Sequence, residues 1–176
     1  RAPMLRDGLD VFTPSHRRVP PESLDPNIKS HNYLNLVMAD LEIRDRAAHA
    51  WAMLLDTRGF VSEGIGSNVF FVKDGELLTP KADYVLPGVS RAVVLELAAA
   101  EGVAAHEVDI SPEQARSADE AFITSTSFCI CPVRSYDEAR LDKTGIPGPI
   151  TRRLIDAFAE EAQFDFVGQY LDALTK

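Results

Sequence analysis

The sequence predicts an α+β protein in which helices surround a curved or barrel-like mixed β-sheet. Short apolar segments typical of strands are joined by hairpin signals, for example Lys-Asp-Gly-Glu at 73–76. Helical segments stand before, between and after these strands, without the regular βα alternation of a doubly wound fold. The length of 176 residues is enough for one sizeable hydrophobic core.

In the first part of the chain, a short strand is expected at about 9–13, followed by an extended Pro-rich stretch. A helix of about four turns is expected within 31–50. One apolar face of this helix contains Leu34, Val37, Met38 and Leu41. Further strands are expected at 51–56, 60–64, 68–75 and 76–80.

In the second part, Gly102 is expected to end a helix that starts at Gly88. Ser111 and Pro112 are typical of the N-cap and first position of a short helix. The remaining expected elements are strands at 103–110, 119–125 and 128–137, an amphipathic helix at 148–163 and a terminal helix at 164–175.

Composition narrows the function classes. The formal net charge of −9 argues against a general nucleic-acid or anionic-membrane surface. No apolar run reaches the roughly 18 residues that span a bilayer. On a strand, the side chains of Cys129 and Cys131 would share a face but lie too far apart to bridge easily, which favours buried, inert thiols in a reducing cytoplasm. Trp51 is expected in the core. The four histidines lack metal-ligand spacing: His16, His31, His49 and His106.

Lys29 is the first candidate for chemistry. A lone lysine is usually a solvated surface residue. Lys29, however, follows the apolar Ile28 and precedes an apolar helical segment, so we expect its stem to be partly buried. A buried lysine loses its charge readily and can form a Schiff base with a carbonyl group.

Glu63 lies inside an apolar strand pair, in the segment GFVSEGIGSNVFFV. One interpretation places it on the solvated face of an alternating strand. The other places it in an apolar site, although a buried carboxylate is costly unless it is paired. Gly64 and Gly66 thin the wall beside it, which suits a carboxylate that meets a flat heterocycle.

Two further segments suit an anion. In LPGVSR (86–91), glycine permits a tight turn, and small residues leave the first amides of the helix uncovered. The hydroxyls of TSTS (124–127) can donate to phosphate oxygens or form a polar turn at a strand end. With Lys29 and Glu63, these groups match pyridoxal phosphate, which needs an amine for its aldehyde, an acid for its ring nitrogen and donors for its phosphate.

The same segments resemble the larger domain of the class IV (fold type IV) aminotransferases. This family includes branched-chain and D-amino acid aminotransferases, (R)-selective amine transaminases and aminodeoxychorismate lyases. Five pieces occur in the family's order and together cover roughly residues 25–155. They are IKSHNYLN, LLDTRGFVSEGIGSNVFFVKDGELLTP, LPGVSRAVVLELAAAEGV, ADEAFITSTSFCICPV and GPITRRL.

The resemblance implies a role for each candidate around the cofactor ring. Lys29 would be the catalytic residue that forms the Schiff base with pyridoxal phosphate. Glu63 would face the pyridine nitrogen, and Leu86 would pack on one face of the ring. Tyr33 would reach the phenolic oxygen, although branched-chain enzymes usually have one more residue between the lysine and this tyrosine. Asn68 would be a structural residue of the motif.

The resemblance also implies the residues at the phosphate. Val89 and Ser90 would contribute helix N-terminal amides, and Thr126 would contribute its hydroxyl. Ser127 would lie near both the phosphate and the carboxylate of the substrate.

By resemblance, the chain would transfer an amino group between an amino acid or amine and a 2-oxo acid, and it would work as a homodimer. Lys29 would carry the proton from the substrate α-carbon to C4′ of the cofactor. Residues 1–24 would form an interdomain segment with the first strand, and 25–176 the cofactor-binding large domain. The family's small N-terminal domain has no counterpart in this sequence, so we expect a fragment of a longer enzyme.

Several alternatives stay open at this point. EGIGSN and TSTS lean slightly toward D-amino acid aminotransferases, whereas LPGVSR and CPVRSYD fit the branched-chain group equally well. A lyase that releases pyruvate from aminodeoxychorismate is the second hypothesis. A truncated, non-catalytic scaffold that binds the cofactor weakly or not at all is the third.

Overall fold

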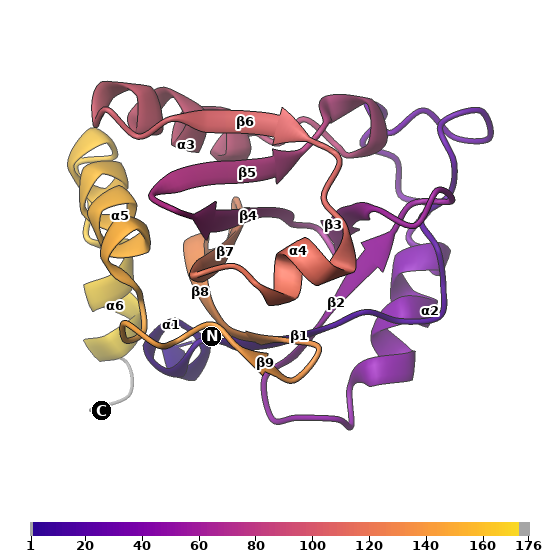
Figure 1. Cartoon of the computed structure of the whole chain (residues 1–176), viewed down its shortest axis with the longest axis horizontal. Helices are drawn as coiled ribbons and strands as arrows, with labels where there is room; N and C mark the ends of the chain where they lie inside the picture. The colour runs from indigo at the N-terminus through magenta and orange to yellow at the C-terminus, as the bar shows by residue number, and fades with distance from the viewer. Residues whose placement is uncertain (1, 173–176) are drawn as a thin grey trace.

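The computed structural model describes residues 2–172, which form a mixed sheet that curls into a half-barrel with helices around it (Figure 1). The described strands are β1 (Leu9–Phe12), β2 (Ala50–Leu55), β3 (Val61–Gly64), β4 (Asn68–Lys73), β5 (Glu76–Pro80), β6 (Ala105–Val108), β7 (Glu120–Ser125), β8 (Cys129–Tyr136) and β9 (Ala139–Arg140). The α-helices are α1 (Ala2–Asp7), α2 (Leu34–Ile43), α3 (Val89–Ala100), α4 (Pro112–Arg116), α5 (Pro149–Glu161) and α6 (Phe166–Asp172). A 3₁₀ turn, η1, covers Ala82–Tyr84.

The strand order is β3-β2-β1-β8-β7-β4-β5-β6, with β9 paired to β8. β1 runs parallel to both β2 and β8, and β5 runs parallel to β6, while the hairpin pairs are antiparallel. The curl brings β3 back beside β4 and β5. The Val61 amide donates to the Ile110 carbonyl oxygen at 2.8 Å across this closure. The predicted α+β class with a curved mixed sheet is confirmed.

The alternation of side chains along the central strands divides the core in two. Phe70 and Phe122 stack with ring centroids 5.0 Å apart on the face covered by α3, α5 and α6. Their chain neighbours Phe71 and Ile123 point to the inside of the curl, where α4 packs (Figure 1). Because both faces are covered, these strands are apolar throughout, as their sequences indicate.

Helix α2 differs most from its expectation. It covers ten residues rather than about four turns, and it starts at Leu34. Its buried residues are Leu36, Ala39 and Ile43, which pack on β1 and β2. The four apolar residues expected on one face of this helix lie on its exposed side: Leu34, Val37, Met38 and Leu41.

The predicted ends of three helices are confirmed in detail. Gly102 follows α3 with a φ of +69°, a conformation that favours glycine. Ser111 caps α4 in a reciprocal capping box with Gln114, and Pro149 opens α5. Helix α6 confirms the terminal helix up to Asp172, and residues 173–175 of that expectation lie outside the described residues. Helix α1 and strand β9 were not predicted.

Candidate active site

A cavity of about 330 Å³ opens where β3 and β7 end and β4 and α3 begin. This volume is within the usual range for small-molecule sites. Seven of the eight candidates line it: Lys29, Tyr33, Glu63, Leu86, Val89, Ser90 and Thr126. Ser127 lies in the turn after β7 but is not a lining residue. Its Oγ is 3.3 Å from Ser125 Oγ, and its carbonyl oxygen accepts a hydrogen bond from the Tyr170 hydroxyl at 3.1 Å.

Lys29 lies at the rim of this cavity, in the loop that precedes α2. The expectation that its stem is partly buried is wrong for the chain alone, because Lys29 is exposed. The loop follows the Pro-rich stretch, and its neighbour Ile28 is also 58% exposed. Lys29 therefore lines the cavity on a side that the described chain leaves open.

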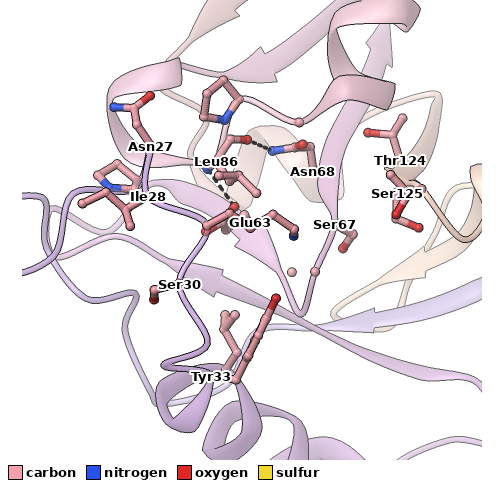
Figure 2. A pocket seen from close by; sticks show the side chains of 18 of the residues that line it. Asn27, Ile28, Ser30, Tyr33, Glu63, Ser67, Asn68, Leu86, Thr124 and Ser125 are labelled. Atoms are coloured by element: carbon pink, nitrogen blue, oxygen red, sulfur yellow. Dashed lines mark hydrogen bonds between the residues drawn. The ribbon is translucent and has the colours of Figure 1, made fainter.

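Glu63 is buried in the wall of the same cavity. Its residue is only 5% exposed, which excludes the solvated-face interpretation. Oε1 accepts a hydrogen bond from Arg18 Nε at 2.7 Å. Oε2 accepts one from the Leu86 amide at 2.9 Å (Figure 2). The carboxylate is thus both paired and hydrogen-bonded, as a buried charge requires.

The phosphate-binding end expected at LPGVSR is built from the start of α3. Gly88 is the N-cap residue, and it has no side chain that could accept a capping hydrogen bond. The first backbone amides of α3 therefore depend on other partners. Ser90 is buried, whereas Val89 is 73% exposed. The helix has twelve residues, so its N-terminus carries the usual partial positive charge.

Thr124 gives an independent sign that an anion belongs here. Its residue is 1% exposed and lines the cavity, and within residues 2–172 its Oγ1 has no hydrogen-bond partner. A buried hydroxyl without a partner is uncommon and costs free energy. A phosphate held by the α3 amides and by Thr126 would offer oxygens near this hydroxyl. The residues present therefore fit the phosphate group of pyridoxal phosphate.

Asn68 connects the wall of the cavity to the turn before α3. Its Nδ2 donates to the Leu86 carbonyl oxygen at 2.8 Å (Figure 2). A Cβ at Gly88 would lie less than 3.0 Å from Asn68 Oδ1, a separation that side chains essentially never show. Close packing therefore requires glycine at this position. The backbone does not, since the φ of −66° at Gly88 is accessible to any residue.

Tyr33 stands at the N-terminus of α2 with its hydroxyl directed toward the cavity (Figure 2). It is partly buried and packs against the hydrophobic cluster between α2, β1 and β2.

The two cysteines take no part in the site. Burial raises the pKa of the Cys131 thiol to about 12 and also raises that of Cys129. Both are free thiols, as expected.

Sequence reasoning missed two contributors to this site. Arg18 lies in none of the five matching pieces, yet it pairs with Glu63 across 45 positions of sequence. Thr124 was seen only as one of four hydroxyls, and no sequence signal separates it from Thr126. The pairing of β4 with β7 distinguishes the two threonines, because Thr124 is the residue opposite Asn68 in this pair of strands.

The geometry agrees with comparisons to known proteins. The sequence model of the family Amino-transferase class IV matches residues 1–136. The branched-chain-amino-acid aminotransferase of Escherichia coli K12 is 36% identical over 159 residues, which are 89% of this chain and 51% of that protein. The crystal structure of an E. coli branched-chain amino acid aminotransferase has a TM-score of 0.85 at 35% identity, covering 91% of this chain and 53% of that one.

The branched-chain amino acid aminotransferase from Thermobaculum terrenum in its PLP-form has a TM-score of 0.83 at 34% identity, covering 93% of this chain and 53% of that one. The chain belongs to the class IV aminotransferase family. It spans about half the length of these relatives. Pyridoxal phosphate is the cofactor of this family, and the amine, carboxylate and helix N-terminus of the cavity fit it.

Proposed function

We propose that this chain is the cofactor-binding part of a pyridoxal-phosphate transaminase that moves an amino group between a branched-chain amino acid and a 2-oxo acid. One observation carries the proposal: one cavity is lined by Lys29, the buried Glu63 and the start of α3, which no side chain caps. In this proposal, residues 1–24 are the interdomain segment with the first strand, and 25–176 are the large domain.

Pyridoxal phosphate supplies an aldehyde that captures amines and a ring that accepts electrons. Glu63 would hold the ring nitrogen and keep a proton there. The α3 amides and the Thr126 hydroxyl would hold the phosphate, and Ser127 would serve the substrate carboxylate. Tyr33 would serve the phenolic oxygen, and Leu86 would pack on the ring.

Lys29 performs the proton transfer in this scheme. Its amine would remove the proton from the substrate α-carbon as a general base and would then return it to C4′ as a general acid. A neutral amine is needed for the first step. The exposed position of Lys29 in this chain therefore calls for cover from another surface, which would exclude water from the amine.

The substrate preference rests on the names of the relatives. Those with 36% identity over most of this chain are called branched-chain aminotransferases. The EGIGSN and TSTS segments are the only features that lean toward D-amino acids. Amino transfer from a branched-chain L-amino acid, with little from D-amino acids, is expected. The reverse preference would contradict this part of the proposal.

A homodimer is the proposed assembly. The exposed face of α2 and the loop before it expose large apolar side chains at one edge of the cavity: Ile28 (58%), Leu34 (69%), Val37 (39%), Met38 (42%) and Leu41 (47%). Apolar side chains grouped in this way are typical of interaction surfaces.

Sedimentation would test the dimer. The unaltered chain is expected to sediment as a dimer and Leu34→Glu with Met38→Glu as a monomer. Phe164→Glu changes an equally exposed residue elsewhere and should leave the dimer intact. A monomeric unaltered chain would contradict the proposal.

The reducing cytoplasm is the proposed setting, because both cysteines are unpaired.

Titration with pyridoxal phosphate tests the function itself. The chain should gain a visible absorption band, Lys29→Ala should lose it, and Lys143→Ala, at another exposed lysine, should keep it. Identical spectra for all three would favour the non-binding scaffold. Pyruvate release from aminodeoxychorismate without an amino acceptor would favour the lyase.

A further inference from the structure

We propose that Arg18 is the positioning residue for Glu63: it holds the carboxylate in the orientation that faces the cofactor ring. The inference rests on the proposed function, because that function assigns the ring nitrogen to Glu63. Arg18 has no role in that function, and its own cavity-lining position was not expected from the sequence.

The ion pair is nearly closed to solvent. Arg18 Nε and Glu63 Oε1 are 2.7 Å apart, and the two side chains are 13% and 7% exposed. A guanidinium is permanently charged and forms short, directional bonds to carboxylates. At this degree of burial the pair is little screened, unlike an ion pair on the surface.

The backbone around Arg18 is fixed from two sides. The Arg18 amide donates to the Leu55 carbonyl oxygen at the end of β2, at 2.8 Å. The Asn35 side chain of α2 brackets the same segment. Its Nδ2 donates to the Arg17 carbonyl oxygen at 2.8 Å, and its Oδ1 accepts from the Val19 amide at 3.3 Å. The guanidinium therefore approaches Glu63 from a backbone that has little freedom to move.

The two oxygens of Glu63 are held by different parts of the fold. Arg18 binds Oε1, and the Leu86 amide binds Oε2 at 2.9 Å. Each carboxylate oxygen can accept two hydrogen bonds, so an acceptor position is left for a ring N–H. Because both oxygens are held, the carboxylate has one defined plane. Without Arg18 it could rotate about its side chain and lose that direction.

The same pair joins three segments of the site. Arg18 precedes the loop that carries Lys29, Glu63 belongs to β3, and Leu86 opens the turn to the phosphate end. The pair thereby fixes the distance between the amine side and the ring-nitrogen side of the cavity. This is a positioning role, since Arg18 acts through Glu63.

The test is a double-mutant cycle on the full chain without cofactor, followed by addition of pyridoxal phosphate. The variants are Arg18→Gln, Glu63→Gln and the two combined. Arg17→Gln is the matched control, because Arg17 is the exposed neighbour on the same segment. Arg18→Lys keeps the charge but not the guanidinium. If Arg18→Gln folds poorly, the same stability and binding measurements can be made on Arg18→Lys.

In thermal unfolding, the combined variant should lose less stability than the two single variants lose together. Each single change leaves one buried charge unpaired, whereas the combined change removes both charges. With pyridoxal phosphate, Arg18→Gln should bind about tenfold more weakly, the effect of losing one charge-assisted hydrogen bond. Its visible band should shift toward that of Glu63→Gln, with Arg18→Lys in between.

Additive stability losses, or an Arg18→Gln spectrum identical to that of Arg17→Gln, would overturn the inference while leaving the proposed function intact. If Glu63→Gln itself leaves the spectrum and the affinity unchanged, the assignment of Glu63 to the ring nitrogen fails, and the proposed function fails with it. The two failures are therefore distinguishable in one set of proteins.

Discussion

Replacement of Gly88 by alanine tests how the turn before α3 is held. The new Cβ would lie less than 3.0 Å from Asn68 Oδ1, so the Asn68 amide must move. It then loses its 2.8 Å hydrogen bond to the Leu86 carbonyl oxygen. Asn68 is 6% exposed, so water cannot readily replace that bond.

The size of the effect follows from these contacts. A buried polar group left without its partner costs about 1–3 kcal/mol. Alanine in place of glycine restricts the unfolded chain and returns about 0.4–1 kcal/mol. The net loss in the free energy of unfolding is about 1–2 kcal/mol, which lowers the melting temperature by roughly 2–8 °C for a chain of this size. Pyridoxal phosphate should also bind more weakly, because Leu86 and the α3 amides move together.

The assay is thermal unfolding with and without pyridoxal phosphate, repeated in an Asn68→Ala background. The smaller side chain leaves room for the new methyl group, so Gly88→Ala should cost nothing there. An equal loss of stability in both backgrounds would refute the steric explanation. A gain in stability for Gly88→Ala alone would refute it as well.

Three other predictions concern the rest of the fold. Glu120→Gln should lower the free energy of unfolding by about 1–3 kcal/mol in urea, because buried Glu120 accepts hydrogen bonds from the Ile150 and Thr151 amides at the start of α5. Hydrogen bonding, chiefly from a backbone amide, lowers the pKa of Glu42 from 4.5 to about 2, so this carboxylate stabilises the fold above pH 4.5 and that contribution is lost as the pH falls toward 2. Alkylation at neutral pH should modify Cys129 well before Cys131, which is fully buried with its pKa raised to about 12.

Each of these has a control. Glu113→Gln changes an exposed glutamate on α4 and should have little effect on urea unfolding. Glu42→Gln should flatten the stability profile between pH 4.5 and 2, and an unchanged slope would contradict the assigned role of Glu42. In the unfolded chain, both cysteines should be alkylated at the same rate. Equal alkylation rates in the folded chain would show that burial does not protect Cys131.

The sheet could be predicted because its strands carry strong local signals. Runs such as NVFFV and AFITS are apolar on both faces, and glycines with positive φ mark the hairpin turns, as at Gly75. Strand β9 escaped prediction because its turn uses Asp137 and Glu138 at positive φ instead of glycine. Helix α1 escaped because six residues hold together only through packing, with Leu5 buried in the core.

The site could be predicted only in part, and the reason is long-range contact. Local pattern identified the chemistry of Lys29, Glu63 and the start of α3. It could not pair Arg18 with Glu63, because β2 brings these residues together: the Arg18 amide bonds to Leu55 at the end of β2, and β2 pairs with β3, which carries Glu63. Periodicity also identified an apolar face on α2, but it could not show what that face contacts, and the face is exposed in this chain.

The attachment point of the cofactor tests the central claim most directly. The chain would be incubated with pyridoxal phosphate, reduced with borohydride to fix the cofactor to the amine that holds it, and mapped by peptide mass spectrometry. The account predicts the phosphopyridoxyl group on Lys29, which lines the same cavity as Glu63. Labelling spread over exposed lysines such as Lys143, with none preferred at Lys29, would contradict it.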